Sequence, residues 1–154
     1  MKQPLSIAGL LMLTVSYLLS GCSAMVPLAS IDKDAEAKLF KVIPNKSNIY
    51  VIHTLAYSQR LHDVTLDGGA RVSLAAKTYT AFSVNPGVHT IAVYSTENRE
   101  FMKLETQAGS NYFIDMGWKM GSGTGDVKVT VELMSESEGM KKIKETQLIS
   151  SDGY

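Results

Sequence analysis

The chain has 154 residues and equal numbers of basic and acidic side chains, 15 of each, so its formal net charge at neutral pH is zero. A chain without a basic excess lacks the field that attracts nucleic acids, which excludes a nucleic-acid partner held by charge. The chain contains a single cysteine and therefore no internal disulfide.

The first 21 residues have the composition of a secretory signal peptide. Lys2 supplies a short basic region, and an apolar stretch without charge follows from Leu5 to Leu19. A permanent membrane-spanning helix needs about 20 apolar residues, and Ser16, Ser20 and Gly21 interrupt the run before that length. The sequence therefore predicts a signal peptide over 1–21 that is cleaved, rather than an anchor helix.

The run Leu19-Ser20-Gly21-Cys22 at the end of this stretch resembles the bacterial lipobox. The resemblance implies that the Cys22 thiol receives a diacylglycerol, that the chain is cut before Cys22 and that the new amino group is acylated. Several acyl chains, at about 0.8 kcal/mol per buried methylene, hold a protein firmly on a membrane. Ser23 stands where the inner-membrane retention pattern has Asp, which favours the outer membrane, facing the periplasm. The alternative is an ordinary signal peptide followed by a chance cysteine.

Cleavage before Cys22 leaves residues 22–154, which suffice for one domain. A lipidated Cys22 leaves no thiol for a nucleophile or a metal site, and no cofactor is expected. The stretch 22–31 is small and irregular, and we expect it to be a lipidated tether. The folded domain is expected over 32–148, with a tail at 149–154.

The first predicted element of the domain is a short helix over Asp32–Phe40. Acidic residues occupy its first turn and good helix formers follow, which places the N-cap near Asp32. Pro44 ends the segment that can be helical. Because two turns of helix are marginal in isolation, Leu39 and Phe40 are expected to pack on the domain.

From Ile49 onward the hydrophobic period is two, and turn signals recur at intervals that are typical of a β-sandwich or barrel. Ile49–Leu55 is apolar on both faces, which predicts a central strand. Asp67-Gly68-Gly69 predicts a hairpin turn, and Asn85-Pro86-Gly87 predicts a second turn. Further strands are expected at Val64–Leu66, Ala70–Leu74, Thr78–Val84, His89–Tyr94, Met102–Ala108, Tyr112–Trp118 and Val127–Leu133.

The last predicted element is a C-terminal helix of two or three turns. Ser135 and Glu138 have the spacing of a capping box, and Met140–Lys144 follows. Met140 and Ile143 share one face of this helix and the lysines share the other. This pattern favours a surface helix on a sheet edge over a basic helix that binds a membrane.

Seven motifs follow one another along the chain: Ile49-Tyr50-Val51-Ile52, Val64-x-Leu66-Asp67-Gly68, Leu74-x-x-x-Thr78-Tyr79, Pro86-Gly87-x-His89-x-Ile91, Ala108-Gly109-x-x-Tyr112-Phe113-Ile114, Met120-Gly121 and Glu138-Gly139. Their order resembles the DUF2846 family of bacterial lipoproteins of unknown function, from about Asp32 to Leu148. The central part also resembles the PEGA type of domain, which is related to transthyretin-like modules. The resemblance implies a mainly β, Ig-like antiparallel sandwich in the envelope, and it implies no catalytic residue. At His53 the chain departs from family members, which often carry Arg there.

Three histidines, His53, His62 and His89, would form a metal site if they converged with a carboxylate such as Asp63 or Asp67. Nothing in their spacing requires convergence. We expect His53 and His89 to be core or rim residues with one satisfied nitrogen, His62 to be exposed, and no metal to be bound.

Other candidate chemistry has simpler structural explanations. The glycine-rich run Gly121–Gly125 precedes a strand, whereas a phosphate loop requires a helix, so a hairpin loop is favoured. No serine lies in a Gly-x-Ser-x-Gly elbow. Asp115, Glu132 and Glu105 are candidates for a pair of carboxylates in general acid–base catalysis, but their positions in the sequence do not indicate which of them lie close together. The sequence therefore predicts a protein that is not an enzyme.

The expected function is that of a lipid-anchored, non-catalytic structural or binding module of the cell envelope. Its expected partners are the membrane, through Cys22, and an envelope protein or a cell-wall component. Tyr94 and Trp118 are the candidate ligand or partner surface, although Trp118 alternates with Ile114 and Met116, which core packing explains. The alternative is a periplasmic small-ligand carrier or enzyme with a pocket between sheet and helices.

Overall fold

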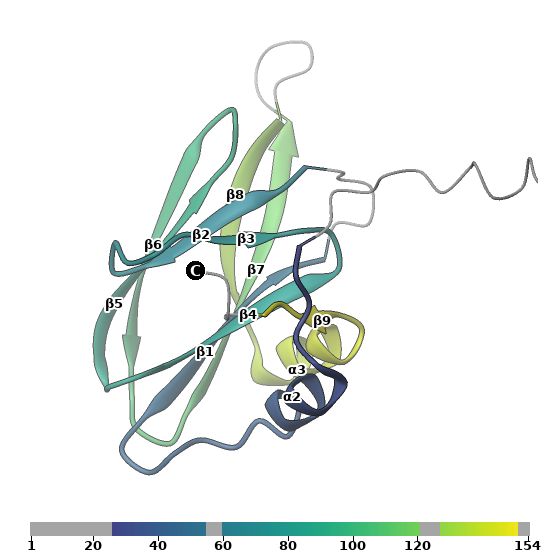
Figure 1. Ribbon diagram of the computed structural model, residues 1–154. Helices are drawn as coiled ribbons and strands as arrows, with labels where there is room; N and C mark the ends of the chain where they lie inside the picture. The colour runs from purple at the N-terminus through teal and green to yellow at the C-terminus, as the bar shows by residue number, and fades with distance from the viewer. Residues whose placement is uncertain (1–25, 55–59, 121–126, 151–154) are drawn as a thin grey trace, which may run out of the picture.

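The computed structural model describes residues 26–54, 60–120 and 127–150, and within them the chain forms a β-sandwich with helices against one outer face (Figure 1). The lipobox residues Leu19 to Cys22 and the run Gly121–Gly125 lie outside these ranges. The elements are α2 (Ile31–Ala37), β1 (Ser47–His53), β2 (His62–Leu66), β3 (Val72–Leu74), β4 (Thr78–Val84), β5 (Gly87–Tyr94), β6 (Arg99–Thr106), β7 (Asn111–Met120), β8 (Val127–Met134), α3 (Glu136–Lys144) and β9 (Gln147–Leu148).

The strands form two sheets, with the orders β8-β7-β1-β4-β9 and β3-β2-β5-β6. This confirms the predicted mainly β sandwich. The sheets are not purely antiparallel, because β1 pairs in parallel with β7 and β4 in parallel with β9. The parallel pair arises because the chain leaves β6 at the end of the sandwich where β1 begins, so β7 runs in the same direction as β1.

Strand β1 is buried along its whole length, as its apolar character on both faces predicts. Ile49 and Val51 point between the sheets into the main core, whereas Tyr50 and Ile52 point outward into a second core beneath the helices. Alternate residues of a strand point to opposite faces, so one central strand serves both cores. The molecule is thus layered as helices, five-stranded sheet and four-stranded sheet.

The two predicted turns have different roles. Asp67 and Gly68 both have positive φ, 51° and 72°, and they join β2 to β3 as a hairpin. The segment Asn85-Pro86-Gly87 leads instead from β4 in one sheet to β5 in the other. The first turn therefore pairs neighbours, and the second closes the sandwich.

Helix α3 begins as the capping box predicts, because Ser135 Oγ accepts from the Glu138 N–H and contacts the Glu138 carboxylate at 2.7 Å. It does not lie on a sheet edge, as expected, but on the outer face of the five-stranded sheet, where Ile143 is fully buried. Gly139 permits this position, since a Cβ there would overlap the ring of Phe113.

Helix α2 begins one residue earlier than predicted and ends sooner. Ser30 is its N-cap, with Oγ accepting from the Lys33 N–H. Phe40, at φ 55°, lies beyond the helix, and its ring contacts the ring of Tyr50 with centres 5.7 Å apart. Phe40 packs on the domain as expected, but Leu39 is 58% exposed, so that part of the prediction is wrong.

The expected tether is partly folded. Val26 is buried in the core between the sheets. The Ala29 N–H donates to Leu148 O at 2.9 Å, and the Ser150 N–H donates to Pro27 O at 2.7 Å. Ile149, expected in a free tail, is buried as well. The boundaries at 31 and 148 are therefore corrected, because residues 26–30 cover the free edge of β9 and belong to the domain.

Candidate functional site

The strand directions bring four sequence-predicted residues to one end of the sandwich. His53 ends β1, His62 begins β2, Tyr94 ends β5 and Trp118 lies near the end of β7. His89 lies at the opposite end. Four candidate residues therefore share one end of the sandwich, and His89 lies apart from them.

Tyr94 lies on the outer face of the four-stranded sheet between two arginines. The guanidinium carbon of Arg71 is 4.6 Å from the centre of the Tyr94 ring, and that of Arg99 is 5.4 Å away. Register explains the second contact, because Tyr94 and Arg99 are directly paired on β5 and β6. We call these three residues the Tyr94 cluster. Cation–π contacts hold both guanidiniums beside one aromatic ring.

The surroundings of the Tyr94 cluster form a shallow platform. Thr65 and Ala92 form its floor at 3% and 4% exposure, and Phe101 stands beside them at 60% exposure. Among the described residues no helix covers this face (Figure 1). Arg71 makes a weak contact with Asp63, 3.5 Å between Nη1 and Oδ2, and Arg99 has no ion pair within the described ranges. Two guanidiniums so placed are suited to a carboxylate.

Trp118 is not part of this platform. It follows Ile114 and Met116 on the inner face of β7 but lies beyond the core and is 50% exposed, so the core-packing explanation is wrong for this residue. Tyr94 and Trp118 belong to different sheets and to different faces, and they do not form one apolar strip.

Asn98, which no sequence motif marks, lies against the free side of the edge strand β8, across that strand from Trp118. Its side-chain amide donates to Val129 O at 3.0 Å, and its carbonyl accepts from Val129 N at 2.8 Å. Val129 is the cross-strand neighbour of Trp118 on the free edge strand β8. Asn98 thus pairs with that edge as a short strand would, and no sequence pattern marks this long-range contact.

His53 and His62 do meet. Their ring centres are 4.9 Å apart with the planes at 84°. His53 is fully buried and His62 is half-buried, so the expectation of an exposed His62 is wrong. Among the described residues, the ring nitrogens of His53 and Nδ1 of His62 have no well-formed hydrogen bond, although the backbone of Ala75 is a polar neighbour of His53. Burial lowers the pKa of His53 and, with the neighbouring His53 ring, lowers that of His62 to about 4. Both rings are therefore neutral near pH 7.

His89 has the opposite environment. Its Nδ1 lies 2.7 Å from Asp67 Oδ2 and its Nε2 lies 2.8 Å from Asn85 O. The hydrogen bond with Asp67 raises the pKa of His89. His89 is separated from the other two histidines, and in the described part of the chain no three His, Cys, Asp or Glu side chains gather as metal ligands would.

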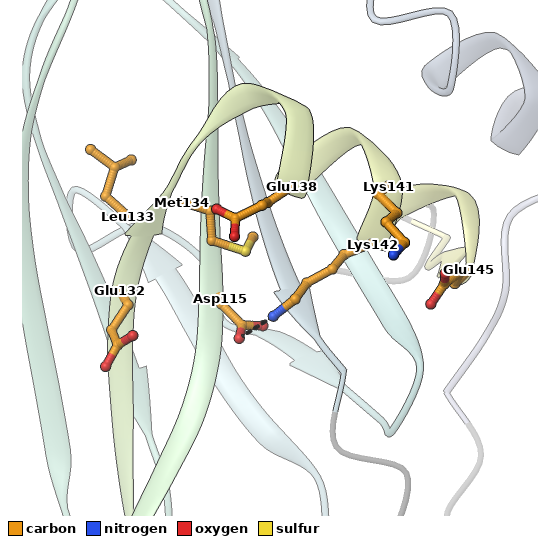
Figure 2. A pocket seen from close by; sticks show the side chains of 8 residues that line it. All are labelled: Asp115, Glu132, Leu133, Met134, Glu138, Lys141, Lys142 and Glu145. Carbon is orange, nitrogen blue, oxygen red and sulfur yellow. Dashed lines mark hydrogen bonds and ion pairs between the residues drawn. The ribbon is translucent and has the colours of Figure 1, made fainter.

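A groove of about 500 Å³ lies between α3, the middle of β7 and the end of β8 (Figure 2). Asp115 and Glu132 are directly paired across the two strands, which brings two predicted carboxylates together, whereas Glu105 lies on the other sheet. Lys142 Nζ lies 2.6 Å from Asp115 Oδ2, as Figure 2 shows. The residues that line this α3 groove are Asp115, Glu132, Leu133, Met134, Glu138, Lys141, Lys142 and Glu145.

The chemistry of the α3 groove is ionic. Its lining contains neither histidine nor a serine or cysteine nucleophile. Asp115 is occupied on both oxygens, because Thr54 Oγ1 also donates to its Oδ1 at 3.2 Å. Such a site can hold a small molecule that carries both charges, but the geometry assembles no nucleophile with a general base.

Within the described residues, no helix has the length and apolar character to cross a bilayer.

Comparison with known proteins gives two findings. The family model described as "Protein of unknown function (DUF2846)" matches residues 44–130. An "Uncharacterized protein" of Haemophilus influenzae (strain ATCC 51907 / DSM 11121 / KW20 / Rd) is 30% identical over 140 residues, which cover 89% of this chain and 81% of that protein. Neither finding tests the likeness to PEGA domains, which stays a prediction.

Proposed function

The chain belongs to the DUF2846 family, which is described as of unknown function, and on that premise we propose that it is a lipid-anchored, non-catalytic binding module of the bacterial envelope. In this proposal Cys22 carries the lipid, and the protein resides on the outer membrane and faces the periplasm. The lipobox Leu19-Ser20-Gly21-Cys22 and Ser23 after it support this location.

The Tyr94 cluster carries the binding part of the proposal. Two guanidiniums flank one half-buried aromatic ring on an uncovered sheet face, and Arg99 has no ion pair within the described residues. A carboxylate could accept hydrogen bonds from both guanidiniums, while Tyr94 and Phe101 contact apolar groups of the partner next to that carboxylate. The partner chemistry is thus a carboxylate, supplied by a cell-wall peptide or by an acidic segment of an envelope protein.

The carboxylates with lowered pKa values all have structural partners within the described residues, which supports a non-catalytic role. Burial raises the pKa of Asp34, but hydrogen bonds from Lys38, Leu148 and Tyr79 lower it further than burial raises it. The bond from Leu148 holds α2 to the strand β9, and the bond from Tyr79 holds it to β4. Asp67 in turn holds two turns together through His89. Carboxylates that are saturated in this way are poor general acids or bases.

Photo-crosslinking in intact cells tests the proposal. A benzoyl-phenylalanine in place of Phe101 should crosslink to a partner, and the additional change Arg99→Ala should reduce the product several-fold. The same probe in place of the exposed Glu136 on α3 is the matched control. Release of the product by a muramidase identifies a cell-wall peptide, and release by a protease after muramidase treatment identifies a protein. A product that forms equally with Arg99→Ala would contradict the binding surface.

A second candidate function, a carrier of a small zwitterionic ligand, is favoured by the α3 groove. Its carboxylates and lysines could bind the two ends of an amino acid or a short peptide. Titration of the full chain with amino acids and dipeptides, followed by NMR of the amides of Asp115 and Lys142, tests this function. Chemical-shift changes that saturate with ligand, and that are absent in Lys142→Met protein, would support a carrier. Unchanged spectra at millimolar ligand would exclude the carrier function.

A further inference from the structure

The N-terminal segment is attached to the domain immediately after the proposed anchor. Val26 is buried between the sheets, Leu28 forms a β-bridge with Ile149, and Ala29 donates to Leu148 O. Only three residues separate Cys22 from Val26 in the sequence. The chain is therefore held to the sandwich almost from its first lipidated residue.

Four residues of extended chain span at most about 14 Å. If Cys22 carries the lipid, Val26 lies no farther than this from the lipid surface. A domain on so short a link cannot turn freely, since the edge that holds Val26 must stay near the membrane. The surface beside this edge is then the surface that meets the lipid.

That surface carries exposed aliphatic side chains. Of the ten large apolar residues that are exposed in the described part of the chain, four lie between positions 28 and 43. Ile31 is 87% exposed, the highest value among the ten. Leu28 lies just before α2, Ile31 is the first residue of α2, and the other two lie on the segment that follows the helix. We call the surface with these four residues the α2 face: Leu28, Ile31, Leu39 and Ile43.

We propose that the α2 face rests on the lipid surface and that the Tyr94 cluster consequently points away from the membrane. This orientation rests on the lipid anchor of the proposed function. The aliphatic side chains of the α2 face enter the boundary between headgroups and acyl chains, where such residues are stabilised. The exposed Lys41 lies between Leu39 and Ile43 and extends toward the lipid phosphates.

The order of the layers gives the second half of the proposal. The helices cover the outer face of the five-stranded sheet, and the four-stranded sheet is the layer farthest from them. Figure 1 shows α2 and α3 on one side of the sandwich and β5 and β6 on the other. A membrane on the α2 side therefore leaves the outer face of the four-stranded sheet open to the periplasm, at one domain thickness from the lipid.

Tryptophan fluorescence in vesicles tests this orientation. The full lipidated chain, with Trp118→Phe as background, receives either Ile31→Trp or Val88→Trp. Val88 is the matched control, because it is 67% exposed on the outer face of the four-stranded sheet. In phosphatidylethanolamine and phosphatidylglycerol vesicles with brominated acyl chains, Ile31→Trp should be quenched several-fold more strongly than Val88→Trp. Equal quenching, or stronger quenching at Val88→Trp, would overturn the orientation.

A measurement on the native sequence avoids any effect of these substitutions on folding. A water-soluble amine reagent should label Lys41 several-fold more slowly in vesicles than in detergent, while the labelling of Lys103 on the four-stranded sheet should not change. The same labelling is then measured for Cys22→Ala protein without vesicles. If Lys41 is equally protected from the reagent there, and the protection grows with protein concentration, a second copy of the chain covers the α2 face and the proposal is wrong.

Flotation separates the failure of the orientation from the failure of the anchor. Native protein should float with the vesicles and Cys22→Ala protein should not. Native protein that fails to float overturns both the anchor and the orientation. Native protein that floats but shows equal quenching at Ile31→Trp and Val88→Trp overturns the orientation and leaves the anchor standing.

Discussion

His89 and Asp67 join the two turns at one end of the sandwich. Nδ1 of His89 lies 2.7 Å from Asp67 Oδ2, and Nε2 of His89 lies 2.8 Å from Asn85 O. A carboxylate and a carbonyl can only accept, so both ring nitrogens of His89 must donate and the ring is an imidazolium. The motifs Leu66-Asp67-Gly68 and Pro86-Gly87-x-His89 are therefore two halves of one charged contact.

This contact predicts a loss of stability at alkaline pH. The hydrogen bond with Asp67 raises the pKa of His89 above its ordinary value of 6.5. The folded state therefore binds the proton of the His89 imidazolium more tightly than the unfolded state does. The stabilisation of the fold by this contact is complete below pH 6.5 and is lost as pH rises through the raised pKa of His89. Urea unfolding between pH 5 and pH 9 should show a loss of about 1 kcal/mol that His89→Gln abolishes. If His89→Gln protein loses the same free energy of unfolding between pH 5 and pH 9, the pH dependence comes from another group.

The buried pair of His53 and His62 predicts the opposite slope at acid pH. The unfolded chain binds a proton at the ordinary pKa of 6.5, but folded His62 does so only at about 4. The stability is therefore complete above pH 6.5 and falls by roughly 1 kcal/mol per unit as pH drops toward 4. Replacing His53 by Phe removes two buried nitrogens that have no well-formed hydrogen bond among the described residues, and should raise the free energy of unfolding at pH 7 by about 1 kcal/mol. A destabilised His53→Phe protein would indicate that these nitrogens have a partner in solution.

Gly139 predicts a large effect of one methyl group. A Cβ at this position would overlap the ring of Phe113, so Gly139→Ala must push α3 away from the sheet. We expect a loss of about 3 kcal/mol, as for an overpacked core, and Phe113→Leu in the same chain should restore part of it. Ser137→Ala, at an exposed position of the same helix, is the control and should change stability by less than about 0.5 kcal/mol.

Local chemistry accounts for what the sequence could predict. Asp67-Gly68 tolerates positive φ at both positions, and Ser135 with Glu138 satisfies the first turn of a helix, so these features depend only on neighbours in the chain. The continuous apolar run in β1 likewise indicates burial on both faces. Features of this kind require no knowledge of the rest of the fold.

Contacts between distant segments explain what could not be predicted. Nothing near Val26 indicates that it fills the core beside Ile149, and the alternation that groups Trp118 with Met116 does not reveal that β7 extends past the core. The Tyr94 cluster was located only in part, because the sequence marks the aromatic ring but not the arginines that register brings beside it. Pairing between strands, rather than the pattern within a strand, decides such sites.

Asn98 predicts a link between stability and association. Its side chain pairs with both backbone groups of Val129 on the edge strand β8. Asn98→Ala leaves these groups without a partner, which should cost about 2 kcal/mol in urea unfolding and should expose an edge that other chains can join. Asn98→Asp keeps the acceptor for the Val129 N–H and should show a smaller loss. Sedimentation that stays monomeric for Asn98→Ala at high concentration would contradict the protection of the edge.

Val26 predicts where the lipid-bearing segment ends and the domain begins. If residues 22–31 were a free tether, truncation of any side chain there would leave stability unchanged. Val26 is instead 8% exposed in the core between the sheets, so Val26→Ala should lower the free energy of unfolding by about 2 kcal/mol through lost burial and the cavity left behind. Pro27→Ala, at the exposed neighbouring position, is the control, and its effect should stay within about 0.5 kcal/mol. Equal unfolding midpoints for the two variants in urea would return residues 26–30 to the tether and would lengthen the reach of the domain from the membrane.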